Sequence, residues 1–262
     1  MAPFKKKRKS GQFLAADGET KKTLHKNLEF TAAAQYKLIR ANLDFTLPEN
    51  EKCPVIGVTS SMRGEGKSTT AVNLSYAFAE KGSRVLLIDA DLRIPSIAKK
   101  LEISSTPGLA DMLRGKGAQI EEFQTCQLSN WFVLPSGDIP PNPSELLGSS
   151  RMEKILTSLK EQFDYIVIDL PPVNIVSDAV AISGLISGMI VVIREEYTEK
   201  KELERCFRQL RLSNVNILGC VMNESSFGSH AYGKYKKNKS YKYYKYYKYY
   251  QYYQSDPKGK KR

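Results

Sequence analysis

Apolar residues in this chain gather in short continuous runs separated by longer amphipathic or polar stretches. Six mainly apolar runs of strand length lie at residues 54–60, 84–90, 131–137, 165–172, 188–196 and 215–223. Runs of this kind are typical of a parallel sheet whose two faces are both covered by helices, whereas a half-exposed sheet shows alternating polar residues. The pattern predicts an α/β fold with a doubly wound, mostly parallel sheet and helices on both faces.

Two stretches carry the spacing of helices. Residues 29–45 (EFTAAAQYKLIRANLDF) place apolar side chains at near-helical intervals, and Pro48 follows as a stop signal. Residues 67–82 (KSTTAVNLSYAFAEKG) come directly after the first apolar run and a Gly-containing turn. We expect the first stretch to form an amphipathic helix ahead of the sheet and the second to form a helix of the strand–helix alternation.

The two ends differ from the middle of the chain. Residues 1–27 are polar and basic, and residues 227–262 are dominated by Gly, Ser, Lys, Tyr and Asn. Neither end has the apolar content needed to build a core, so we expect a flexible N-terminal arm and a flexible C-terminal tail. The segment 28–226 is then one folded domain.

Charge is concentrated at those ends. The chain has a formal net charge of +12, to which the cluster at 5–9 contributes +5 and the segment 234–262 contributes +10. Subtracting both leaves the body near −3. A body of that sign is a poor platform for nucleic acid, while basic ends could equally meet acidic lipid headgroups or a partner protein.

Metal-type spacings and membrane segments are not found. The cysteines are far apart and the chain has only 2 histidines, which predicts reduced thiols and no zinc site; the cysteines are Cys53, Cys126, Cys206 and Cys220. No apolar run approaches the roughly 20 residues that cross a bilayer, and the N-terminal basic cluster lacks a signal-peptide core behind it.

The segment VTSSMRGEGKSTT, residues 58–70, has the context of a phosphate-binding loop. Gly64 and Gly66 allow backbone N–H groups to converge on phosphate oxygens, Lys67 can reach the β and γ phosphates, and the next hydroxyl can ligate Mg²⁺. The spacing matches G-x-x-x-x-G-K-[ST] except that Ser61 replaces the first glycine. The predicted ATP-binding residues are Gly64, Glu65, Gly66, Lys67, Ser68 and Thr69. The alternative is a turn that only caps a helix.

Three aspartates end two of the apolar runs. Asp89 and Asp91 are two residues apart, so both can lie on one side of the strand end, and Asp169 ends the run YIVID. Hard carboxylates beside a phosphate loop suit Mg²⁺ and a polarised hydroxyl. The alternative is that each is merely a solvated or capping acid.

The motifs GEGKST, VLLIDADLRIP, YIVIDLPP and LPSGDIPPNPSELL together resemble those of the bacterial tyrosine kinases (BY-kinases) of capsule and exopolysaccharide synthesis, Gram-positive type, over residues 29–223. The resemblance implies a cytoplasmic P-loop kinase that uses ATP and Mg²⁺ to phosphorylate tyrosines. It also implies four kinds of partner: a transmembrane adaptor of polysaccharide co-polymerase type that activates the kinase and recruits it to the inner face of the membrane, other copies of the chain, protein tyrosine substrates, and a tyrosine phosphatase.

The resemblance also implies roles for single residues. Lys67 and Ser68 would hold nucleotide and metal, and Asp89, Asp91 and Asp169 would form the metal and base cluster, with Arg93 close by as a catalytic residue. We favour Asp89 as the base that takes the tyrosine proton, and we place Asp91 and Asp169 with Ser68 on the Mg²⁺ side. On this view Lys67→Met abolishes phosphotyrosine but spares folding.

Assembly into a ring through the 29–45 helix is implied as well, although Ala34 and Lys37 occupy positions where the family has other residues and only Arg40 is retained. The alternative is that this helix packs only on its own sheet. A related fold group, the partitioning and septum-positioning ATPases, carries a second lysine early in the loop where this chain has Met62. A partitioning-type ATPase that binds DNA or membrane through its basic tail is the alternative function, and a scaffold is a third.

The C-terminal tail holds nine tyrosines and three lysines within residues 241–253. Nucleic-acid stacking, a strand and a kinase substrate all fit tyrosine-rich composition, but regular lysines and the lack of aliphatic residues disfavour a buried strand. With the kinase motifs present, we expect phosphorylation and no nucleic-acid partner. The predicted phospho-acceptors are Tyr241, Tyr243, Tyr244, Tyr246, Tyr247, Tyr249, Tyr250, Tyr252 and Tyr253.

Overall fold

The computed structural model describes residue 24 and residues 27–115, 123–125 and 128–224 of the 262-residue chain. The elements below belong to one compact unit. Most of the predicted N-terminal arm and all of the predicted tail, including every tail tyrosine, lie outside the described residues. Leu24 falls within the predicted arm, and its side chain is buried in the core.

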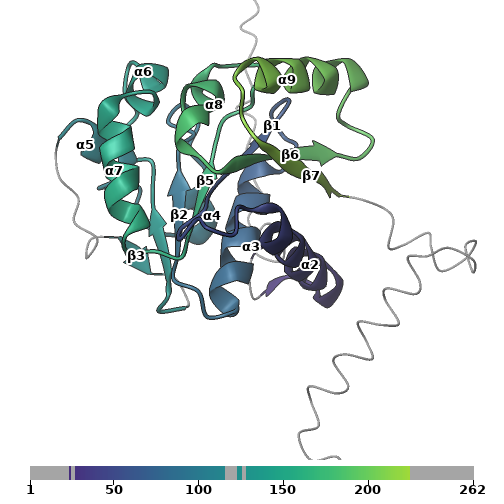
Figure 1. Cartoon of the computed structure of the whole chain (residues 1–262), viewed down its shortest axis with the longest axis horizontal. Helices are drawn as coiled ribbons and strands as arrows, with labels where there is room; N and C mark the ends of the chain where they lie inside the picture. The colour runs from purple at the N-terminus through teal and green to yellow at the C-terminus, as the bar shows by residue number, and fades with distance from the viewer. Residues whose placement is uncertain (1–23, 25–26, 116–122, 126–127, 225–262) are drawn as a thin grey trace, which may run out of the picture. The chain divides into compact units, whose positions relative to one another are not determined.

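A seven-stranded sheet runs through the unit (Figure 1). Its strands are β1 (Val55–Ser60), β2 (Val85–Asp89), β3 (Gln124–Thr125), β4 (Trp131–Leu134), β5 (Tyr165–Asp169), β6 (Gly188–Arg194) and β7 (Ile217–Asn223). They lie in the order β3-β4-β2-β5-β1-β6-β7, and every neighbouring pair is parallel except β3 with β4. The predicted α/β class and mostly parallel sheet are confirmed.

One helix precedes the first strand, and further helices lie between the strands. They are α2 (Phe30–Thr46), α3 (Lys67–Glu80), α4 (Ile97–Leu101), α5 (Leu109–Leu113), α6 (Pro143–Leu147), α7 (Ser150–Lys160), α8 (Asp178–Ala181), the 3₁₀ turn η3 (Ser183–Leu185) and α9 (Lys200–Leu212). None of the helices in the described part of the chain has the length and apolarity needed to cross a membrane.

Two hydrophobic cores explain why the strands are continuous apolar runs. Along β2, Leu86 and Ile88 belong to one core, whereas Val85 and Leu87 belong to the other. The first core also contains apolar residues of α5, α7 and α9, and the second contains residues of α2, α3 and α4. Successive strand side chains point to opposite faces, so a sheet covered on both faces needs an apolar residue at every position.

The α2 helix lies beside α3 and uses its basic residues within the chain (Figure 1). Arg40 donates a 2.6 Å hydrogen bond from Nη1 to the carbonyl of Ala77, in the last turn of α3. Lys37 forms a 3.0 Å ion pair with Glu80. Carbonyls at a helix end lack intrahelical donors, so Arg40 satisfies one of them. Packing of α2 within its own domain is therefore enough to explain the presence of Arg40.

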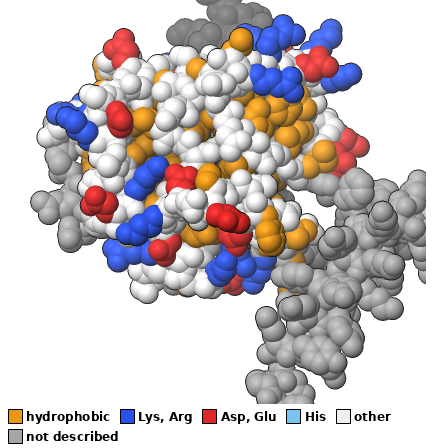
Figure 2. Space-filling model, in the orientation of Figure 1, with side chains coloured by type: hydrophobic (Ala, Val, Ile, Leu, Met, Phe, Trp, Pro, Cys, Tyr) orange, Lys and Arg blue, Asp and Glu red, His pale blue; other side chains and the backbone are white. Residues whose placement is uncertain are grey.

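Lys and Arg side chains gather over α9 on the face seen in Figure 2, where acidic side chains lie among them. The exposed residues Lys201, Arg205 and Arg208 follow at helical spacing, while Cys206 and Leu210 are buried against the sheet. This is the division into a polar and an apolar stripe that a covering helix needs.

Candidate active site

The turn between β1 and α3 has the backbone conformation of a phosphate loop. Gly64 and Gly66 have φ of 80° and 95°, a region that residues with a Cβ adopt at a cost. A Cβ on Gly66 would lie 1.9 Å from Nδ2 of Asn223, so a larger residue here would also displace the Asn223 side chain from the loop. The first helical hydrogen bond of α3 runs from the N–H of Thr70 to the carbonyl of Gly66, which leaves earlier N–H groups facing the turn.

Glu65 anchors this loop from inside. Its side chain is buried and accepts hydrogen bonds from Ser61 Oγ (2.7 Å), the Met62 N–H (2.9 Å) and Thr198 Oγ1 (2.6 Å). The serine that replaces the first glycine of the motif thus supplies a hydrogen bond across the loop. The carboxylate of Glu65 is engaged within the protein, so Glu65 can contact a phosphate only through its backbone N–H.

Side chains at the ends of β6 and β7 hold the loop from the other side. Arg194 donates to the Gly64 carbonyl (3.1 Å), and Asn223 donates to the Glu65 carbonyl (3.1 Å). Tyr197 donates its hydroxyl to the carbonyl of Arg63 at 3.2 Å. No sequence motif marks these residues, because single polar residues at or just after a strand end are common; only the fold places them here.

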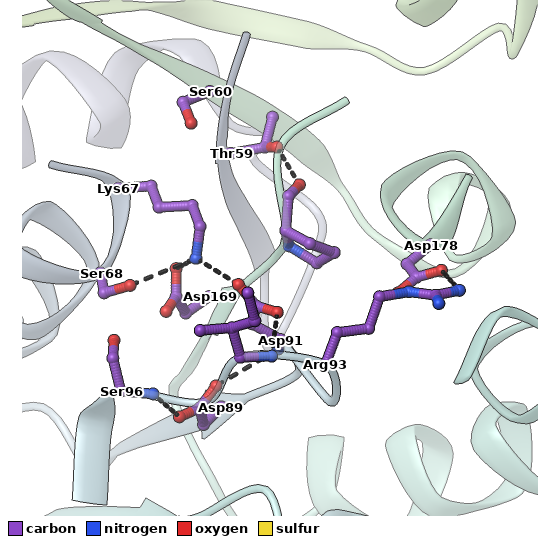
Figure 3. Close-up of polar contacts among 12 residues, drawn as sticks. Thr59, Ser60, Lys67, Ser68, Asp89, Asp91, Arg93, Ser96, Asp169 and Asp178 are labelled. Carbon is purple, nitrogen blue, oxygen red and sulfur yellow. Dashed lines mark hydrogen bonds and ion pairs between the residues drawn. The ribbon is translucent and has the colours of Figure 1, made fainter. Parts of the chain in front are cut away.

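Lys67 lies between two of the predicted carboxylates (Figure 3). Its Nζ is 2.8 Å from Oδ2 of Asp91 and 3.4 Å from Oδ1 of Asp169, and 3.3 Å from Oγ of Ser68. Burial lowers the pKa of Lys67, but the attraction of Asp169 and Asp91 outweighs it and raises the pKa above its ordinary value. The structure brings these four predicted residues together at the ends of β2 and β5 and the start of α3.

Asp89 lies directly opposite Asp169 in the pairing of β2 with β5. Its Oδ1 accepts the N–H of Asp91 at 3.2 Å, and its Oδ2 accepts the N–H groups of Ser96 (3.1 Å) and Ile97 (3.0 Å). Burial and the charge of Asp169 raise the pKa of Asp89 to about 7, although the hydrogen bond from Ile97 opposes the shift. Burial also raises the pKa of Asp169, against the attraction of Lys67 and the hydrogen bond of Ser68. Asp89 therefore shapes the loop after β2, and its surroundings disfavour its charged form.

The donor set fits a magnesium ion held jointly with a nucleotide. Oδ2 of Asp169 is buried and has no hydrogen-bond partner among the described residues. In that same part of the chain, no group of three His, Cys, Asp or Glu side chains is arranged to hold a metal alone. Mg²⁺ commonly takes one or two carboxylates and completes its shell with water and phosphate oxygens, so Ser68, Asp91 and Asp169 are the residues that would hold it.

Arg93 extends away from Lys67 and toward α8 (Figure 3). Its Nε and Nη2 donate to the two carboxylate oxygens of buried Asp178, at 2.9 and 3.0 Å. Ser144, in the PPNPSELL segment, also donates to Asp178 and accepts from Arg93 at 3.2 Å. This bidentate pair ties the loop after β2 to α6 and α8, and it engages the guanidinium group to which the resemblance assigns a catalytic role. Neither Asp178 nor Ser144 was singled out from the sequence.

The fold and this loop define a class of nucleotide-binding domain. The family model of the AAA domain matches residues 53–217 of the chain. Among solved structures, the septum site-determining protein MinD from Pyrococcus horikoshii OT3, complexed with Mg-ADP, has a TM-score of 0.54 at 26% identity, covering 70% of this chain and 72% of that one. The chain therefore has a P-loop of the ATP-binding kind.

Relatives with higher identity define the family more narrowly. The tyrosine-protein kinase YwqD of Bacillus subtilis is 37% identical over 202 residues, 77% of this chain and 85% of that protein. The tyrosine-protein kinase CpsD of Streptococcus pneumoniae serotype 4 is 33% identical, over 79% of this chain and 92% of that protein. This chain belongs to the bacterial tyrosine kinases of capsule and exopolysaccharide synthesis, of the Gram-positive type, and it is a tyrosine-protein kinase.

Solved structures agree with that family. The chimerical protein CapA2B2 has a TM-score of 0.73 at 28% identity, covering 79% of this chain and 90% of that one. The kinase domain of the Escherichia coli tyrosine kinase ETK has a TM-score of 0.69, also at 28% identity, covering 79% and 80%. The expected kinase fold is thus found over the described domain.

The pairing of Lys67 changes what we expect of its substitution. Lys67→Met leaves the buried carboxylates of Asp91 and Asp169 without their cation, so the nucleotide-free protein should lose on the order of 3 kcal/mol of its free energy of unfolding. The sequence alone predicts that this change spares folding, whereas the buried ion pairs predict that it does not. Urea unfolding checks the loss, with Lys81→Met as a control because the Lys81–Asp44 pair is largely exposed.

The free energy of unfolding that Lys67→Met removes should be larger at pH 8 than at pH 5. The charge of Lys67 lowers the pKa of both Asp169 and Asp89, so its removal raises these two pKa values in the folded protein. A carboxyl whose folded pKa exceeds its unfolded value destabilises the fold as the pH rises through the interval between the two values. At pH 5 protonation relieves the variant, whereas at pH 8 it does not. Equal losses for Lys67→Met and Lys81→Met at both pH values would contradict this account.

Proposed function

We propose that this chain is a tyrosine autokinase that transfers the γ-phosphate of ATP to tyrosines of its own C-terminal tail, mainly between subunits, and to other proteins. Through this transfer it regulates the synthesis and export of a capsular or other exported polysaccharide. The observation that carries the proposal is the placement of Lys67 between Asp91 and Asp169, next to Asp89 and a P-loop, in a chain that belongs to the tyrosine kinases.

Each residue has a proposed part in the transfer. The P-loop N–H groups and Lys67 bind phosphate, and Ser68, Asp91 and Asp169 hold Mg²⁺, which neutralises charge on the phosphate oxygens when bound. Asp89 takes the proton of the acceptor tyrosine. A free phenol has a pKa of about 10, so it needs an acceptor near neutral pH, and a carboxyl with a pKa of about 7 suits that task.

The tail is the proposed acceptor because a tethered segment reaches roughly millimolar effective concentration and needs little sequence recognition. Each phosphate adds about −1.5 to −2 of charge, so a few of them reverse the sign of the lysine-bearing tract. An unmodified cationic tail would dock at an acidic site of a neighbouring subunit, and a heavily phosphorylated one would leave it.

Mass spectrometry of the 232–262 peptide after incubation with Mg-ATP tests the transfer. We expect phosphotyrosine in wild type and none in Lys67→Met, which lacks the phosphate-binding ammonium. Mixing Lys67→Met with a variant in which the nine tyrosines of 241–253 are Phe tests transfer between subunits, since only the first carries those nine acceptors and only the second is active. The readout is phosphate on those nine tyrosines, because Tyr232 and Tyr235 of the same peptide are present in both variants. ATP hydrolysis without modified protein would favour the partitioning-type ATPase, and an unmodified peptide in the mixture would contradict transfer between subunits.

An adaptor is the second part of the proposal. We propose that the kinase works in the cytoplasm and is recruited to the inner face of the membrane by a transmembrane adaptor whose cytoplasmic segment activates it. Structural similarity to the chimera named CapA2B2 supports a second component. A peptide of that segment should raise the initial rate of tail phosphorylation at saturating Mg-ATP, measured with anti-phosphotyrosine antibody; the same rate with and without the peptide would remove this part of the proposal.

Self-association through α2 is the third part. Arg40 and Lys37 are engaged within the chain, so we assign contact between subunits to the exposed apolar side chains of Phe30, Leu38 and Phe45, of which Phe45 is 89% exposed. Phe45→Ser together with Leu38→Ser should lower the mass seen by light scattering without lowering the melting temperature, because neither side chain is buried. Asn42→Ser, an exposed change on the same helix, is the matched control. An unchanged mass for the double variant would rule out this surface.

A further inference from the structure

A second lysine, Lys100, reaches the first turn of α3 from the neighbouring helix α4. The α4 helix begins where the N–H groups of Ser96 and Ile97 donate hydrogen bonds to Asp89. Its Nζ is 3.4 Å from Oγ1 of Thr69, two residues after Lys67. The turn after β2 and the helix after the phosphate loop thus bring Lys100 to the loop, although no motif in the sequence includes it.

The charge of Lys100 is not compensated in the way that the charge of Lys67 is. Lys67 is paired with Asp91 and Asp169, whereas none of the ion pairs among the described residues includes Lys100. The side chain is nonetheless half-buried, and its polar contact is a long hydrogen bond to a neutral hydroxyl. Burial lowers the pKa of Lys100, and the attraction of Asp169 does not make up the difference. A cation that is partly desolvated without a carboxylate beside it is stabilised by an anionic ligand.

The charges beside the loop leave room for a further cation. Before Mg²⁺ binds, the two buried aspartates Asp91 and Asp169 outnumber the single ammonium of Lys67, so these three groups carry a net negative charge when the acids are ionised. The free N–H groups at the start of α3 attract an anion to the same place, beside Thr69. An anion bound there has the hydroxyl of Thr69 and the ammonium of Lys100 on its flank.

We propose that Lys100 is a second phosphate-binding cation of the nucleotide site, which contacts the phosphates of ATP and of the product ADP from the side of Thr69. Lys67 is shared with the carboxylates, and Lys100 supplies positive charge that remains available before the nucleotide arrives. The inference rests on the proposed use of ATP but concerns binding alone. The competing explanation is that Lys100 packs its alkyl chain on α3 and carries its charge into solvent.

Lys100→Gln in the full-length chain separates the two explanations, because it keeps a polar group near Thr69 and removes the charge. We expect the Kd for ADP in Mg²⁺ to rise about tenfold, as is usual when one charged hydrogen bond is lost. The dependence of that Kd on salt should also become shallower, since one fewer charge meets the phosphates. Lys99→Gln is the matched control: Lys99 is the preceding residue of the same helix and is exposed.

Two further measurements make the outcome decisive. Lys100→Arg should retain most of the ADP affinity, and the melting temperature of the nucleotide-free Lys100→Gln protein should be no lower than that of Lys99→Gln. An ADP affinity equal to that of Lys99→Gln, or a loss of affinity with unchanged salt dependence and a lower melting temperature, overturns the proposal. Absence of tail phosphotyrosine in wild type would defeat the proposed function instead, and it leaves the comparison of ADP affinities unaffected.

Discussion

The site depends on two buried acids that the sheet forces together. Because β2 and β5 pair in register, Asp89 lies opposite Asp169, and both side chains are fully buried. Two carboxylates so placed repel each other and resist ionisation, which burial reinforces. The protein tolerates them because Lys67 reaches Asp169 and backbone N–H groups surround Asp89. The repulsion and burial of these two carboxylates cost folding free energy. The same two effects favour the binding of a cation or a proton at this end of β2 and β5.

A second layer of contacts keeps the phosphate loop in shape around that pair. Glu65 closes the loop through three donors, one of them Ser61, and residues from the ends of β6 and β7 hold its carbonyls. On the other side, Arg93 and Asp178 lock the loop after β2 to α8. The loops are thus fixed by their neighbours before any ligand arrives, as electrostatic preorganisation of a transfer site requires.

Much of this could be predicted from the sequence, for physical reasons that also set the limit. The six long strands, α3 and the meeting of Lys67 with Asp91 and Asp169 follow from continuous apolar runs and from acids at strand ends. The two-residue strand β3 and helices of four or five residues, such as α8, are too short to show a period. Asp178, Thr198 and Lys100 were missed because their roles depend on partners remote in sequence. Arg40 also donates to a carbonyl in the last turn of α3, a contact that the helical spacing of residues 29–45 does not indicate.

The contact between Asn223 and the phosphate loop also sets where a shortened protein can stop. Asn223 is the last residue of β7, and its side chain both donates to the Glu65 carbonyl and fills the space beside the Cα of Gly66. A truncation designed only to preserve the core could end a residue or two earlier, because the outer side chains of β7 bury little. Such a protein would keep its sheet but lose the side chain that supports the phosphate loop. A catalytic fragment should therefore extend at least to Asn223.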